Sequence, residues 1–156
     1  MSDSIDIDAQ GLDIERLIPQ RPPMRIVECI ERVDDSSIQT TSVVRESWPT
    51  LKDGQASSIM LIELIAQSAA ALQGWKERHQ QPAGIGGLLV GIPSAKANVP
   101  LVALGTRLHC AVHITHGATN YMAFAGEVRD EQGMLLFTGS IQAYRPEDPA
   151  PGGDTP

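Results

Sequence analysis

Residues 57–72 read Ser-Ser-Ile-Met-Leu-Ile-Glu-Leu-Ile-Ala-Gln-Ser-Ala-Ala-Ala-Leu, and this is the most informative stretch of the chain. It is almost entirely apolar, and it predicts one long helix over about residues 59–76. Ser57 and Ser58 are of the type that caps helices at their start, and Gly74 is of the type that ends them. A helix this apolar is expected to be buried.

Glu63 is the single charged residue of that stretch. At 3.6 residues per turn, Glu63 and Gln67 share a face, with Met60 and Ala70 above and below them. An ionised carboxylate in apolar surroundings is costly unless it is paired, solvated or functional. The pattern therefore suits acid–base chemistry on an uncharged, apolar substrate. The alternative is a carboxylate that reaches the surface or caps a neighbouring loop.

The composition disfavours several classes of function. The chain has 156 residues, enough for one domain, and a net charge of −7, which disfavours a nucleic-acid or anionic-membrane partner. No apolar run approaches the ~20 residues that span a bilayer, and the acidic start has no apolar signal segment, so we expect a cytoplasmic protein. Cys29 and Cys110 are expected to be buried thiols.

The rest of the chain reads mainly as strands. Pro19 ends a short helix predicted at its start, and a polar loop over residues 46–57 leads into the long helix. This order predicts an α+β fold, an antiparallel sheet wrapped around one long central helix. We expect a flexible N-terminus, one domain and a disordered proline-rich tail, over residues 1–11, 12–145 and 146–156. The predicted short helix covers residues 12–18, and the predicted strands cover residues 24–30, 37–45, 88–92, 107–115, 121–128 and 134–144.

Two stretches resemble a known family. Residues 17–24, Leu-Ile-Pro-Gln-Arg-Pro-Pro-Met, are similar to a Leu-Pro-His-Arg-x-Pro-Phe motif, and residues 61–67 are similar to a helix that carries a glutamate and a glutamine. Both belong to the hotdog-fold 3-hydroxyacyl-ACP dehydratases, and the chain looks closest to the dehydratase-like proteins of aryl-polyene lipid clusters. The resemblance implies a hotdog fold and an acyl-ACP or acyl-CoA thioester substrate of fatty-acid or polyene lipid biosynthesis. It implies no cofactor and no metal.

The resemblance also implies roles for single residues. Glu63 is the expected catalytic group, Gln67 orients it, and the backbone N–H of Ser58 aligns with the donor that serves the thioester carbonyl. The expected acyl tunnel is lined by Met60, Gly91 and Ile92.

The catalytic histidine of the family is missing. Trp48-Pro49-Thr50-Leu51-Lys52 stands where the family has Gly-His-Phe-Pro-Gly, and Gln20 replaces the other family histidine. His109 and His113 lie about 13 Å apart on the polar face of one strand, too far for one metal ion. We expect these two residues, and His79 and His116, to be solvated.

Three functions remain open: a dehydratase-like lyase, a catalytically silent subunit that binds acyl chains or pairs with an active paralogue, and an acyl thioesterase. Because a sheet around one helix leaves an open edge, we expect a homodimer, or a heterodimer with a related hotdog protein, formed through the edge strand at residues 88–92.

Overall fold

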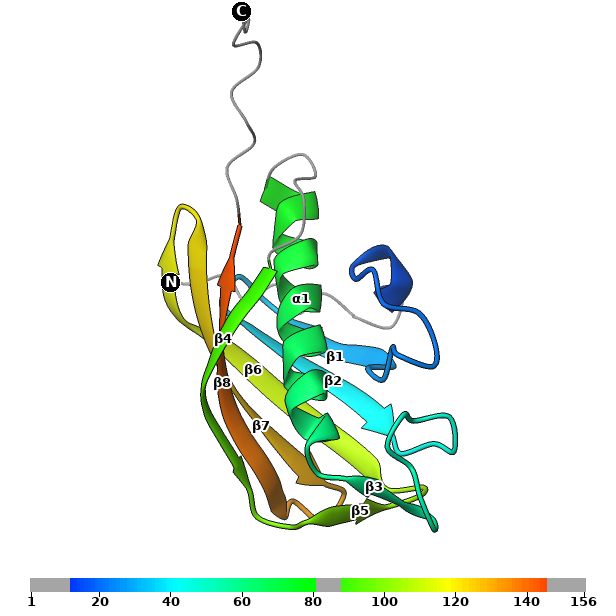
Figure 1. Ribbon diagram of the computed structural model, residues 1–156. Helices are drawn as coiled ribbons and strands as arrows, with labels where there is room; N and C mark the ends of the chain where they lie inside the picture. Colours follow the sequence, from blue (N-terminus) through cyan, green and yellow to red (C-terminus); the bar gives the residue numbers. More distant parts are fainter. Residues whose placement is uncertain (1–11, 81–87, 146–156) are drawn as a thin grey trace, which may run out of the picture.

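The computed structural model describes residues 12–80 and 88–145. Within these ranges, one long helix lies across a six-stranded antiparallel sheet with strand order β1-β2-β6-β7-β8-β4, and two short strands, β3 and β5, pair beside it (Figure 1). The α+β prediction is confirmed. In chain order the elements are the 3-10 helix η2 (Ile14–Arg16), β1 (Cys29–Val33), β2 (Ser37–Val43), β3 (Gln55–Ser57), α1 (Met60–Gln80), β4 (Leu88–Ala97), β5 (Leu101–Ala103), β6 (Arg107–Ala118), β7 (Tyr121–Asp130) and β8 (Leu135–Tyr144).

Two glycines allow the helix to pack closely against the sheet. Gly126 of β7 and Gly139 of β8 face each other in register. A Cβ atom at Gly126 would lie 2.8 Å from Ile65 Cγ2, and one at Gly139 would lie 2.7 Å from Ile62 Cδ1. The missing side chains therefore make the room that the two helix isoleucines fill, and Leu61 and Leu64 are fully buried beside them.

Gly74 does not end the helix as predicted, because α1 continues to Gln80. Gly74 instead lies where the N-terminal segment crosses the helix, and a Cβ there would be 2.4 Å from the Leu17 carbonyl oxygen. Gly74 thus permits a close contact between the helix and the backbone of Leu17. In the sequence, a glycine used in this way cannot be told from one that ends a helix.

Three further local predictions differ from the structure. Residues 24–28 are not part of a strand, since β1 begins at Cys29, and the predicted loop over residues 46–57 contains β3, which pairs with β5. The predicted helix at residues 12–18 is a single 3-10 turn. The backbone of residues 24–27 bonds instead to a side chain of α1, described below.

Strand β4 forms one edge of the sheet, as predicted, and pairs on one side with β8. Leu89, Val90 and Ile92 are large apolar side chains of this edge that are about half exposed. Strand β1 forms the other edge.

The predictions for residues 1–11 and 146–156 lie outside the described residues. No helix among the described residues is long and apolar enough to cross a membrane. Both cysteines have free thiols; Cys110 is buried, but Cys29 is exposed, contrary to the prediction.

Candidate functional site

Glu63 lies in the first turn of α1, on a stripe of half-buried and exposed residues. One side of α1 faces the sheet and the other faces away from it (Figure 1). Helical spacing puts Ile59, Ala66 and Ala70 on the same stripe. Ile59 is 59% exposed, and Ala66 and Ala70 are half-buried. Glu63 itself is half-buried. Glu63 is therefore accessible to a ligand and shares its stripe with the apolar side chains of Ile59, Ala66 and Ala70.

Gln67 holds Glu63 in place. It is 1% exposed, and its Nε2 donates to Glu63 Oε1 at 2.9 Å and to the Met24 carbonyl at 2.7 Å. Its Oε1 accepts from the backbone N–H groups of Ile26 at 2.9 Å and Val27 at 3.2 Å. Both ends of the amide are thus fixed, so the amide can present only its N–H to Glu63. The carboxylate lies within hydrogen-bonding reach of Gln67, as the sequence predicts.

The segment that fixes Gln67 is itself tied to the sheet. Ser42 Oγ on β2 donates to the Ile26 carbonyl, and the Glu28 N–H donates to the Thr41 carbonyl at 3.0 Å. The Glu28 carboxylate also accepts two hydrogen bonds from the Arg45 guanidinium. The orientation of Glu63 is therefore set by a chain of contacts from β2 through residues 24–28 to Gln67.

The Ser58 N–H is not free to bind a substrate. It donates to the Pro100 carbonyl at 3.0 Å, so it would have to break that bond to serve a thioester oxygen. The neighbouring Ile59 N–H makes only a 3.4 Å contact with Ser57 Oγ.

The three predicted tunnel residues lie on two elements. Met60 is buried, 8% exposed, one turn before Glu63, whereas Gly91 and Ile92 lie on the edge strand β4. Ile92 is 47% exposed. Their role as a tunnel lining stays a prediction.

No described histidine lies beside the helix face that carries Glu63. In the segment that replaces the family's histidine loop, Trp48 is buried in the core, 4% exposed. His109 and His113 alternate with core residues of β6 and so lie on the sheet face away from α1, His109 with its Nδ1 3.7 Å from Glu31. His116 is exposed beside Tyr121. The His79 side chain lies outside the described residues.

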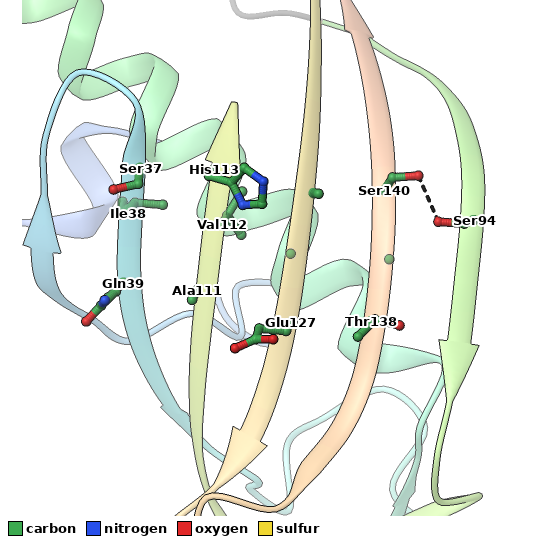
Figure 2. A pocket seen from close by; sticks show the side chains of 13 residues that line it. Ser37, Ile38, Gln39, Ser94, Ala111, Val112, His113, Glu127, Thr138 and Ser140 are labelled. Atoms are coloured by element: carbon green, nitrogen blue, oxygen red, sulfur yellow. Dashed lines mark hydrogen bonds between the residues drawn. The ribbon is translucent and has the colours of Figure 1, made fainter. Parts of the chain in front are cut away.

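A hollow of about 590 Å³ lies on the sheet face away from α1 (Figure 2). Ala111 and Ala125 help to line it, together with the polar side chains of Gln39, His113 and Glu127. Figure 2 shows these side chains in front of the strands and the helix behind them. The sheet therefore separates this hollow from Glu63. No group of three or more His, Cys, Asp or Glu residues in the described ranges is arranged to hold a metal ion.

A buried polar cluster that local sequence patterns do not reveal lies under the helix. Thr40 Oγ1 and Ser68 Oγ are 2.8 Å apart, and the Cys110 thiol hydrogen-bonds to both residues. Burial raises the pKa of this thiol to about 12, although the hydrogen bonds from Ser68 and Thr40 lower it. Cys110 is therefore a neutral packing group and not a nucleophile.

The long helix on a curved antiparallel sheet, with one positioned carboxylate on the helix, defines a hotdog protein of the dehydratase-like class. The chain belongs to the ApeP-like family, described as ApeP dehydratase, whose family model matches residues 12–151. No curated protein matches the chain.

Among solved structures, the chain is similar to the dehydratase heterocomplex ApeI:P from Xenorhabdus doucetiae. The identity is 25%, the match covers 88% of this chain and 93% of that one, and the TM-score is 0.78.

More distant likenesses show the fold alone. A hypothetical thioesterase with coenzyme A from Streptococcus pneumoniae is 17% identical over 76% of this chain and 84% of that one, with a TM-score of 0.59. The protein smu.793 from Streptococcus mutans, bound to acetyl CoA, is 11% identical over 81% of this chain and 94% of that one, with a TM-score of 0.63.

Proposed function

We propose that this chain is the acid-bearing subunit of a lyase that removes water from 3-hydroxyacyl thioesters. The observation that carries the proposal is the geometry of Glu63. This half-buried carboxylate on an apolar helix stripe is held by the buried Gln67 amide, whose other three hydrogen bonds are to the backbone. An amide this constrained leaves Glu63 Oε2 as the oxygen that carries the exchangeable proton.

The reaction requires two groups. A base takes a proton from C2 of the acyl chain, the C2–H electrons form the C2–C3 double bond, and the C3–O bond breaks as the hydroxyl leaves. Glu63 gives that hydroxyl its proton, so that it departs as water. The catalyst ends with a Glu63 carboxylate and a protonated base, and proton exchange with solvent restores both.

None of the histidines whose side chains the structure describes is placed to act as this base. Three of the four histidines are described on the far sheet face or in an exposed hairpin, so they do not reach the helix face that carries Glu63. The likeness to a dehydratase heterocomplex supports a second subunit as the source of the base. We propose that this subunit is a related hotdog protein that carries the family's loop histidine and docks along β4 and the open stripe of α1.

The substrate carrier is an acyl carrier protein or coenzyme A, and the pathway is fatty-acid or polyene lipid biosynthesis in the cytoplasm. The dehydratase family fits a hydroxyacyl substrate, and the two likenesses to coenzyme-A-bound structures fit a thioester.

The test is an assay of the purified chain, alone and mixed with a His-bearing hotdog subunit, on N-acetylcysteamine thioesters of a 3-hydroxyacid and of its saturated counterpart. The proposal predicts loss of water from the hydroxy substrate only in the mixture. Release of thiol from both substrates would make the chain a thioesterase. Water loss in the mixture that survives Glu63→Gln unchanged would make it a silent subunit.

A further inference from the structure

Strand β4 is an irregular edge. From Leu89 to Ser94 it advances five residues, while its partner β8 advances three, from Ala143 to Ser140, because β4 is bulged on both sides of Gly91. Pro93 lies inside this irregular part and has no N–H to donate. Bulges and proline are features by which edge strands avoid unwanted pairing.

The two halves of β4 differ in chemistry. The first half presents Leu89, Val90 and Ile92, which are 51%, 56% and 47% exposed. The second half is exposed as well but carries Lys96, which makes no ion pair with any residue in the described ranges. A strand that covers this edge must therefore be apolar at one end and suited to a cation at the other.

A second copy of this chain fails that requirement. In an antiparallel pairing about a two-fold axis, the first residue of one strand faces the last residue of its copy. If Leu88–Ala97 pairs with itself over its whole length, Leu89 faces Lys96 and Val90 faces Ala95. The axis then falls between Ile92 and Pro93, where both bulged regions and both prolines meet.

Self-pairing over the first half alone avoids Pro93 but gains little. Centred on Val90, it joins only residues 88–92 and crosses the bulge between Leu89 and Gly91. The strand beyond Ile92 then has no partner.

We propose that Pro93 and Lys96 prevent β4 from pairing with a second copy of this chain and reserve the edge for a different subunit. The occupant is a hotdog chain whose edge strand is apolar opposite Leu89, Val90 and Ile92 and acidic opposite Lys96. The identity of this occupant rests on the proposed function, but the exclusion of self-pairing does not.

The test needs neither a partner nor a substrate. Light scattering after size exclusion, at about 10–50 µM protein, is expected to give a monomer for the wild type and a dimer for Pro93→Thr/Lys96→Val, which restores the missing N–H and removes the cation. Arg107→Val is the matched control, because it replaces an exposed cation on β6, which is paired on both sides. This variant is expected to stay monomeric.

Cross-linking gives a second readout that does not depend on the double variant folding well. In a Cys29→Ser background, Val90→Cys and Ala95→Cys would face each other across the two-fold axis of a self-paired edge. Oxidation is expected to leave this protein monomeric on a non-reducing gel. A wild-type dimer in solution, or a disulfide-linked dimer of the cysteine variant, would overturn the exclusion; failure of the dehydration assay would not.

Discussion

At the scale of the residue, Gln67 contributes more to stability than an orienting group would. Its amide satisfies the buried N–H groups of Ile26 and Val27 and the carbonyl of Met24. Each buried group left without a partner costs about 1–3 kcal/mol. Gln67→Ala is therefore expected to lower the free energy of unfolding by roughly 2–5 kcal/mol in urea titrations. Gln73→Ala, half-buried on the same helix, is the control, and equal stability of the two variants would refute the role given to Gln67.

Cys110 gives the fold a dependence on alkaline pH. Its pKa is raised from 9.0 to about 12 in the folded chain, mainly by burial. A raised pKa means that its contribution to stability is complete below the ordinary thiol pKa and is lost as the pH rises toward the folded value. Above pH ~9 the free energy of unfolding is expected to fall by about 1.4 kcal/mol per pH unit from this group.

The measurement is urea unfolding at several pH values between neutral and alkaline, for the wild type and for Cys110→Ala. The variant is expected to be less stable near neutral pH and to lack this part of the slope. Thiol labelling of the native protein near neutral pH gives an independent check, since exposed Cys29 should react and buried Cys110 should react only after denaturation. Parallel pH profiles for the two proteins would contradict the assignment.

At the scale of the element, the glycines under α1 set how closely the helix approaches the sheet. At Gly126 an added methyl group meets Ile65 Cγ2 and Val112 Cγ2, which are branched and packed, at 2.8 and 3.0 Å. At Gly139 the nearest atom is the terminal Cδ1 of Ile62, which can rotate away. Gly126→Ala is therefore expected to cost about 1–3 kcal/mol of stability, and Gly139→Ala less. The measurement is the thermal unfolding temperature of each variant. A lower temperature for Gly139→Ala than for Gly126→Ala would contradict this packing.

The sequence is enough to predict the long helix, the antiparallel sheet and the hydrogen bond between Glu63 and Gln67, because all three follow from local periodicity. It does not show that Gly74 lies inside the helix, since only the tertiary contact with Leu17 reveals why a glycine is there. It also misassigns residues 24–28, whose apolar side chains are typical of a strand but whose backbone bonds to Gln67. The engagement of the Ser58 N–H by Pro100 is likewise a long-range contact with no local signal.

At the scale of the whole molecule, the proposed function makes this chain one half of a site. The carboxylate of Glu63 is half-buried, and the first half of the edge strand β4 is apolar and exposed. His109 and His113 lie on the other face of the sheet. These features are explained together if a second subunit covers β4, encloses Glu63 and supplies the base. A heterodimer with one complete site per Glu63 is the expected assembly.

The most direct test of this account is kcat/KM for dehydration of a 3-hydroxyacyl N-acetylcysteamine thioester by the complex with the His-bearing subunit, compared between wild type and Glu63→Gln. Glutamine keeps the shape of Glu63 and its contact with Gln67 but cannot deliver a proton, so the rate is expected to fall by about 10²–10⁴-fold. The mass of the complex and its affinity for the saturated thioester should not change. Equal kcat/KM for the two complexes would contradict the central claim that Glu63 is the acid.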